Sequence, residues 1–259
     1  MDRAGFLAGL GFEPDSFQLR AFDAVDAGHS VVVAAPTGSG KTVVAEYAVA
    51  QALATGRKAF YTTPLKALSN QKYGDLVRRH GLEHVGLLTG DNAINGDAPV
   101  VVMTTEVLRN MIYAGSPALE GLRWVVLDEV HYLQNAYRGP VWEEVIIHTP
   151  PPVGLVCLSA TVSNAEELAD WIRTVRGAAE VIIEEKRPVE LQNLYLVGDR
   201  NAERLLLMPT LIDGRPNPEA LAIDERLKPN AASRGRGRGR GYTPWRAEVI
   251  ERLRDEAML

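Results

Sequence analysis

The first 185 residues of the chain alternate between short apolar runs and longer segments with helical periodicity. The apolar runs are rich in β-branched residues and lack a polar residue at every second position, which is typical of parallel strands covered on both faces. The alternation of strands and helices predicts a doubly wound α/β fold with a mostly parallel sheet. The predicted strands are residues 30–35, 58–62, 85–88, 100–103, 124–128, 153–158 and 180–183.

The clearest helical signal follows Ser163. Ser163 and Glu166 have the spacing of a capping box, and apolar residues then recur on one helical face at Leu168, Ile172 and Val175. Two further segments have helical periodicity between predicted strands, residues 42–54 and residues 64–79.

The pattern changes after Lys186. A strand is predicted at residues 190–197, turns rich in proline and asparagine surround residues 215–218, and an amphipathic helix is predicted at residues 244–258. Residues 234–241 alternate strictly between arginine and glycine, and this apolar-free run predicts a flexible linker. We therefore expect three parts: an α/β domain at 1–185, an extended β segment with the Arg-Gly linker at 186–241, and a helical segment at 242–259.

Composition limits how such a protein could bind a polyanion. The 259 residues carry a formal net charge of −5, although residues 226–246 contain seven basic and no acidic residues. An acidic main body must therefore bind phosphates through backbone N–H groups and helix N-termini rather than through a basic field. Cys157 is the single cysteine, and no apolar run approaches the roughly 20 residues of a membrane span. These features predict a soluble, cytoplasmic protein that does not enter a membrane.

A candidate phosphate-binding loop follows the strand that ends at Ala35. Gly38 and Gly40 allow the backbone to curl so that successive N–H groups face the β- and γ-phosphates of a nucleotide. Lys41 is expected to reach those phosphates, and the Thr42 hydroxyl is expected to ligate Mg²⁺. The sequence therefore predicts an ATP site with Mg²⁺ at the loop Thr37, Gly38, Ser39, Gly40, Lys41 and Thr42.

An acidic box begins at the last residue of the predicted strand at residues 124–128. Asp128 is expected to hold Mg²⁺, and Glu129 is expected to orient and deprotonate the water that attacks the γ-phosphate. His131 is expected to link the nucleotide site to its surroundings. We predict Glu129, Asp128 and Lys41 as the catalytic residues.

The sequence Asp128-Glu129-Val130-His131 is a DEVH box, and with the phosphate loop it resembles the DExH helicases of superfamily 2. The resemblance is to the superkiller-type RNA helicases, including bacterial HelY-type members, and covers residues 11 to about 196. It implies a RecA-like motor domain that couples ATP hydrolysis to single-strand binding and duplex unwinding in RNA processing or decay. It also implies an RNA-degrading nuclease as a partner.

Further residues take their expected roles from this resemblance. Residues 11–18 resemble the adenine-reading segment of the family, in which Gln18 bonds the base and Phe12 stacks on it. Core packing is the alternative role of Phe12 and Phe17. Nucleic-acid contacts are expected at Pro64, Leu65, Lys66, Gly90, Asp91, Thr104 and Thr105. Coupling between hydrolysis and strand handling is expected at His131, Ser159, Ala160 and Thr161.

Helicases of this type close ATP between two RecA-like domains, and the second domain supplies arginine fingers. No second set of sheet motifs follows residue 197. We therefore expect the chain to be part of a longer enzyme, with the final helix leading toward the second RecA-like domain. The isolated chain is expected to hydrolyse ATP weakly and not to unwind a duplex. The alternatives are a DNA helicase of the same superfamily and an ATP-dependent nucleic-acid-binding module without unwinding activity.

Overall fold

The computed structural model describes residues 3–160, 165–189, 193–199, 204–227 and 245–257. The chain divides into two compact units, Met1–Pro188 and Val189–Leu259. The first unit ends three residues after the predicted boundary, because Glu184 still bonds to β1 and Pro188 still lies near Gly38 of the phosphate loop. Within the described residues, no helix is long and apolar enough to cross a membrane.

The first unit is built on an eight-stranded sheet with the order β4-β3-β5-β2-β6-β7-β1-β8. All neighbouring strands are parallel except β3 and β4. The seven predicted strands are all present, each within two residues of its predicted ends, and the short β4 is an addition. The strands are β1 (Ser30–Ala34), β2 (Lys58–Thr63), β3 (Val85–Leu88), β4 (Ala93–Ile94), β5 (Val100–Thr104), β6 (Leu122–Leu127), β7 (Gly154–Ser159) and β8 (Ala179–Ile183).

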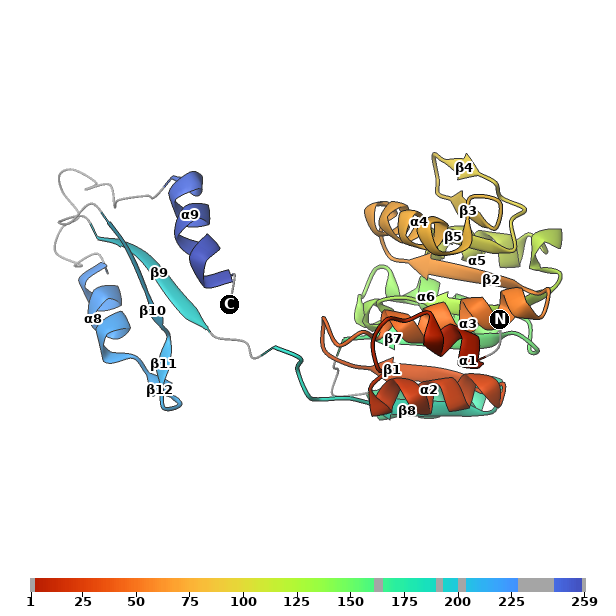
Figure 1. Cartoon of the computed structure of the whole chain (residues 1–259), viewed down its shortest axis with the longest axis horizontal. Helices are drawn as coiled ribbons and strands as arrows, with labels where there is room; N and C mark the ends of the chain where they lie inside the picture. The colour runs from red at the N-terminus through yellow and green to blue at the C-terminus, as the bar shows by residue number, and fades with distance from the viewer. Residues whose placement is uncertain (1–2, 161–164, 190–192, 200–203, 228–244, 258–259) are drawn as a thin grey trace. The chain divides into compact units, whose positions relative to one another are not determined.

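Helices cover both faces of this sheet, so the doubly wound α/β fold is confirmed (Figure 1). One face packs against α1 (Arg3–Ala8), α2 (Ser16–Asp26), α3 (Thr42–Ala54) and α4 (Lys66–His80). The other face packs against α5 (Thr105–Tyr113), α6 (Gly139–His148) and α7 (Ala165–Arg176). Two short 3-10 turns, η1 (Pro117–Leu119) and η2 (Val130–Gln134), lie in the connections that flank β6.

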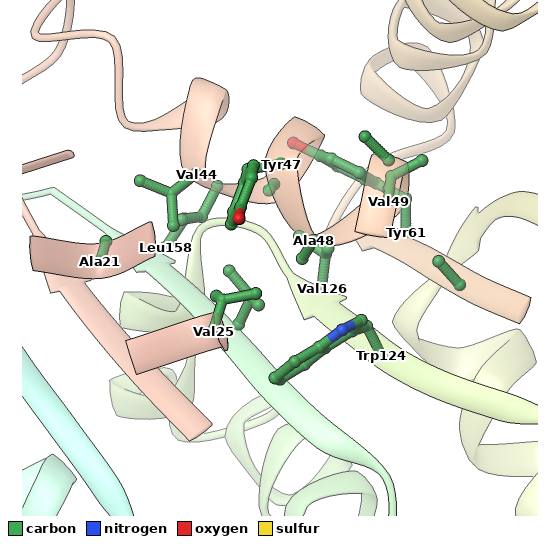
Figure 2. Close-up of a cluster of buried hydrophobic side chains, with 14 of the residues drawn as sticks. Ala21, Val25, Val44, Tyr47, Ala48, Val49, Tyr61, Trp124, Val126 and Leu158 are labelled. Atoms are coloured by element: carbon green, nitrogen blue, oxygen red, sulfur yellow. The ribbon is translucent and has the colours of Figure 1, made fainter. Parts of the chain in front are cut away.

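The core on the α2–α3 face is built around a buried tryptophan (Figure 2). Trp124 on β6 is fully buried, and its indole N–H donates to Oε1 of Gln51 on α3 at 2.7 Å. A Cβ at Gly154 on the neighbouring β7 would lie 2.0 Å from the Trp124 ring, so only glycine fits there. This packing fixes α3, and with it the loop that precedes α3, against the sheet.

The second unit contains two small antiparallel ribbons and two helices. Its elements are β9 (Leu194–Asp199) paired with β10 (Arg204–Pro209), β11 (Leu211–Ile212) paired with β12 (Arg215–Pro216), α8 (Pro218–Leu227) and α9 (Arg246–Ala257). The strand predicted at 190–197 corresponds to β9, which extends two residues further, while residues 190–192 are outside the described part of the chain. The Arg-Gly run at 234–241 also lies outside the described residues.

Helix α8 corrects the prediction that residues 186–241 contain only extended structure and linker. Pro218 occupies the first helical position, where its missing N–H costs nothing. The side chain of Asn217 accepts a hydrogen bond from the backbone N–H of Glu219 at 3.0 Å, which satisfies one free donor of the first turn. The sequence Asn-Pro-Glu is therefore the start of a helix and not the turn that its proline and asparagine predict.

Candidate nucleotide and nucleic-acid site

The predicted site residues follow the carboxyl ends of neighbouring strands. Because these strands are parallel, their carboxyl ends meet at one edge of the sheet, where α/β proteins bind ligands. The sheet order places the phosphate loop after β1, Ser159 at the end of β7, Asp128 after β6, Pro64 after β2 and Thr104 at the end of β5. The structure thus brings the nucleotide and nucleic-acid residues to one edge.

The phosphate loop has the curled backbone that the sequence predicts. Gly38 and Gly40 have φ values of 86° and 81°, a conformation that favours glycine. Ser39 Oγ donates to the Pro36 carbonyl at 2.8 Å, which fixes the turn from inside. Lys41 is largely buried, and its Nζ donates to the Ala35 carbonyl at 3.3 Å across the loop. The two positive-φ glycines and the ammonium held across the loop are features that suit the binding of phosphate groups.

The adenine-reading segment lies against this loop. Gln18 is 2% exposed, its Nε2 donates to the Gly40 carbonyl at 3.0 Å, and its Oε1 accepts from the Asp15 N–H at 2.9 Å. Each amide atom retains one further hydrogen-bonding position for a base. Phe12 is 51% exposed and can stack on a ring, whereas Phe17 is 1% exposed and belongs to the core.

Asp128 begins the acidic box and is held by three hydrogen bonds. Its backbone N–H donates to the Thr62 carbonyl at 3.0 Å, which continues the pairing of β6 with β2. Its Oδ1 accepts from the Glu129 N–H at 3.0 Å, and its Oδ2 accepts from the Tyr61 hydroxyl at 2.9 Å. The carboxylate is therefore oriented by its neighbours before any ligand binds.

Glu129 has a left-handed backbone, with φ of 54° and ψ of 45°. Side chains other than glycine, asparagine and aspartate rarely adopt this conformation, and such strain clusters at functional sites. Its Oε2 lies 3.2 Å from Nδ1 of His131, a separation typical of an ion pair but without hydrogen-bond geometry. The predicted base and the predicted coupling residue are thus in direct contact.

Two residues at this site were not predicted. Tyr61 on β2 is fully buried, and burial followed by the negative charge of Asp128 raises the pKa of its phenol well above the usual value. The hydroxyl therefore stays protonated and acts as a donor to Asp128. Lys72 on α4 donates from Nζ to Thr42 Oγ1 at 3.4 Å and lies 5.9 Å from the centre of the Tyr61 ring.

The oxygen donors suit a magnesium–nucleotide complex better than a protein-enclosed metal. Thr42 offers a hydroxyl and Asp128 a carboxylate, and Mg²⁺ is usually held by one or two such groups together with phosphates and water. Among the described residues, no group of three or more His, Cys, Asp or Glu side chains could hold a metal ion. The site therefore fits Mg²⁺ that arrives with phosphates.

Ser159 lies between the two halves of the nucleotide site, because β7 separates β1 from β6. Its carbonyl accepts from the Ala35 N–H at 3.1 Å, while its buried Oγ has no hydrogen-bond partner in the described part of the chain. Ala160 is half-buried beside Ser159, and Thr161 is outside the described residues.

Five of the seven predicted nucleic-acid residues, all except Asp91 and Thr105, line a hollow of about 420 Å³, here called the strand hollow. Lys66 pairs with Asp91 at 2.8 Å on its rim. Thr105 is fully buried, its hydroxyl donates to the Thr63 carbonyl, and it does not line the hollow, so the strand contact predicted at Thr105 is wrong. The hollow is lined by Pro64, Leu65, Lys66, Gly90, Thr104, Glu106, Val107, Asn110 and Arg138.

The sheet order, the phosphate loop and the acidic box define a RecA-like P-loop domain. A family model described as "DEAD/DEAH box helicase" matches residues 15–168. The chain belongs to the DEAD/DEAH box helicases and, within them, to the superkiller-type DExH family. This confirms the family inferred from the DEVH box.

Relatives support this assignment at high identity. The protein described as "Probable helicase HelY" of Mycobacterium tuberculosis is 54% identical over 98% of the chain, and "Superkiller complex protein 2" of Mus musculus is 50% identical over 73%. The chain spans 29% of the first of these proteins and 15% of the second. Among solved structures, the DUF1998 helicase MrfA bound to DNA has a TM-score of 0.60 over 71% of this chain and 30% of its own, at 23% identity, which shows a shared fold.

Proposed function

We propose that the chain is the ATP-binding motor domain of an ATP-dependent RNA helicase, which couples ATP hydrolysis to single-strand binding and duplex unwinding. The observation that carries this proposal is the position of the phosphate loop, the acidic box and the strand hollow at one edge of one sheet. A ligand in the hollow and a nucleotide on the loop would then contact neighbouring strands, so that each can influence the other.

In this proposal the chain's own residues bind Mg·ATP and place the attacking water. Lys41 and the N–H groups of the loop bind the β- and γ-phosphates, and Thr42 and Asp128 hold Mg²⁺. Bound ATP supplies the phosphoryl group that is transferred to water. Glu129, next to His131, orients and deprotonates that water. Phe12 stacks on the adenine.

A second RecA-like domain, from a longer protein, is part of this proposal. It would close over the exposed side of the loop, exclude water and supply arginine fingers to the transferring group. The short length of the match within its relatives supports this, since the chain spans less than a third of each. The domain boundaries of such a protein would follow the two units, with residues 189–259 after the first motor domain.

We propose RNA rather than DNA as the bound nucleic acid, because the names of two relatives point to RNA. The "DExH-box ATP-dependent RNA helicase DExH15 chloroplastic" of Arabidopsis thaliana is 52% identical over 70% of the chain, and the mouse relative is named for the superkiller complex. By analogy we propose a role in RNA processing or decay in the cytoplasm, beside an RNA-degrading nuclease. The rival is a DNA helicase, which the DNA bound to MrfA brings into consideration.

A competition experiment distinguishes RNA from DNA as the preferred ligand. A labelled single-stranded RNA is bound to the chain in the presence of Mg²⁺ and a non-hydrolysable ATP analogue, and unlabelled RNA or DNA of the same sequence is added. Displacement by RNA at lower concentration than by DNA supports the proposal, and the reverse order supports the DNA helicase. If the chain binds the nucleotide but neither RNA nor DNA, the proposal that it is a helicase motor domain is wrong.

The second alternative is an ATP-dependent nucleic-acid-binding module without unwinding activity. It differs in needing no general base, whereas the strained backbone of Glu129 favours a residue held for chemistry. Strand-stimulated hydrolysis in a protein extended through the second domain, lost on Glu129→Gln, supports the helicase. Absence of strand-stimulated hydrolysis in the unaltered extended protein supports the binding module, and equal hydrolysis in the variant would mean that another residue positions the water.

A further inference from the structure

Arg138 joins the acidic box to the strand hollow. The 3-10 turn η2 starts directly after Glu129, and Arg138 follows it immediately before α6. The side chain of Asn135 accepts hydrogen bonds from the backbone N–H groups of Tyr137 and Arg138, each at 3.0 Å, which fixes the direction in which the arginine leaves the chain. Neither the predicted motifs nor the proposed roles above use this residue.

The guanidinium of Arg138 contacts two walls of the hollow. One of its terminal nitrogens donates to the Pro64 carbonyl and to Oε1 of Glu106, each at 2.5 Å. The rings of Tyr132 and Trp142 lie behind it, with their centres 5.7 and 5.6 Å from the guanidinium carbon. Aromatic rings and a fixed carbonyl hold the planar group in one orientation, which lysine could not reproduce.

The charge of Glu106 gives this contact a functional consequence. Glu106 lines the hollow with a side chain that is 34% exposed, so its carboxylate faces a space in which a phosphate is expected. A carboxylate without its partner would repel a phosphate at short range. Lys66, the other cation of the lining, already pairs with Asp91. With Lys66 paired to Asp91, Arg138 is the cation of the lining that neutralises Glu106.

The contact with Pro64 adds a second effect. Pro64 ends the turn after β2, and α4 begins two residues later at Lys66. The free N–H groups of a helix N-terminus attract anions. Because Arg138 binds the Pro64 carbonyl, it fixes the segment that leads into this N-terminus.

We propose that Arg138 is a positioning residue for strand binding, which neutralises Glu106 and fixes Pro64 so that the hollow accepts a nucleic-acid phosphate. This inference rests on the proposed function and deepens it. Arg138 affects strand binding indirectly, through the charge of Glu106 and through the position of the loop at Pro64. It predicts that removing the Glu106 charge compensates for removing the Arg138 charge.

The test is a double-mutant cycle on the full 259-residue chain, with a fluorescein-labelled single-stranded RNA as the probe and anisotropy as the readout. Arg138→Gln is expected to weaken RNA binding by about 10- to 100-fold, the effect of losing a charge-assisted hydrogen bond in the site. Glu106→Gln alone is expected to bind RNA at least as tightly as the unaltered chain. The double variant is expected to recover most of the affinity lost in Arg138→Gln.

Arg57→Gln is the matched control. Arg57 also donates to backbone carbonyls, those of Gly121 and Leu122 at 3.0 and 3.5 Å, but it lies at the amino end of β2, away from the hollow. It is expected to leave RNA binding unchanged, and thermal unfolding of all four variants checks their folding. A general loss of stability would not be reversed by Glu106→Gln, so recovery separates positioning from a merely structural role.

Three results would overturn the inference: Arg138→Gln binding RNA as tightly as the unaltered chain, no recovery in the double variant, or weaker binding by Glu106→Gln alone. The last result does not depend on whether Arg138→Gln folds. Failure of the proposed function has a different signature, because the unaltered chain would then bind Mg·ATP but neither RNA nor DNA.

Discussion

The hydroxyl of Tyr61 gives the sharpest test of the nucleotide site. Tyr61→Phe removes one oxygen and leaves the ring in the core, so the buried apolar area is unchanged. The lost interaction is a hydrogen bond of 2.9 Å to the Asp128 carboxylate, which is only 8% exposed and so has little access to water as a replacement donor. We expect the free energy of unfolding to fall by about 1.5–3 kcal/mol, the range for hydrogen bonds to charged groups.

The same variant should weaken metal-dependent nucleotide binding. Asp128 would keep its bond from the Glu129 N–H but lose the contact that orients Oδ2. Removing such an outer partner of a metal ligand typically costs about 10- to 100-fold in metal affinity. Calorimetric titration with ATP in the presence of Mg²⁺ should therefore show the loss, whereas titration without Mg²⁺ should show little change.

Tyr47→Phe is the matched control for this experiment. Tyr47 is also buried, and its hydroxyl also donates to a carboxylate, that of Asp26 at 2.5 Å, on the side of α3 that faces α2. It should lower stability without changing Mg·ATP binding. The reasoning is refuted if Tyr61→Phe binds Mg·ATP as tightly as the unaltered chain, or if both variants lose affinity equally.

Three further predictions concern the loop, the base and the linker. Lys41→Ala should weaken Mg·ATP binding by about 2–3 kcal/mol by calorimetry, because no other cation of the loop can reach the terminal phosphates; unchanged affinity would refute the loop assignment. In a protein extended through a second motor domain, Glu129→Gln should retain ATP binding while RNA-stimulated hydrolysis falls by at least about 10²-fold. Deletion of residues 234–241, which contain no apolar side chain, should leave the melting temperature and ATP binding unchanged, and a large drop would contradict the linker interpretation.

The strands were predictable because their residues allow few alternatives. Runs such as Ser30–Ala34 and Val100–Thr104 are rich in valine and are buried along their whole length, which is how parallel strands between two helical layers read. The helices predicted at residues 42–54 and 64–79 are present as α3 and α4, whereas α1, α2 and α6 were not predicted. Helix α6 has a proline in its first turn and apolar residues with helical spacing at Val141, Trp142, Val145 and Ile146. This pattern is a local signal from which the helix could have been predicted.

The site residues that belong to a local sequence motif were predictable. Those that reach the site only through strand register or contacts distant in sequence were not. Tyr61 pairs in register with Val126, and Asp128 lies two residues after Val126, directly past the end of β6, so both side chains fall on the same face of the sheet. That register cannot be derived from a single sequence. Arg138 contacts Pro64 and Glu106 from a position 74 and 32 residues away, and nothing local marks such a contact.

The backbone of Glu129 leads to the last prediction. The other two non-glycine residues with positive φ in the described part of the chain are Asn95 and Asp213, types that tolerate this conformation, whereas glutamate does not. Glu129→Gly should be more stable than Glu129→Ala by about 0.5–1 kcal/mol, because glycine relieves the backbone strain by more than it adds unfolded-state entropy. At Glu143, exposed in the middle of α6, the order should reverse, since glycine lowers helix stability relative to alanine. Denaturant unfolding of the four variants measures both differences. Alanine at 129 proving as stable as glycine, with the normal order kept at 143, would mean that Glu129 is not strained and that the acidic turn costs the fold nothing to hold.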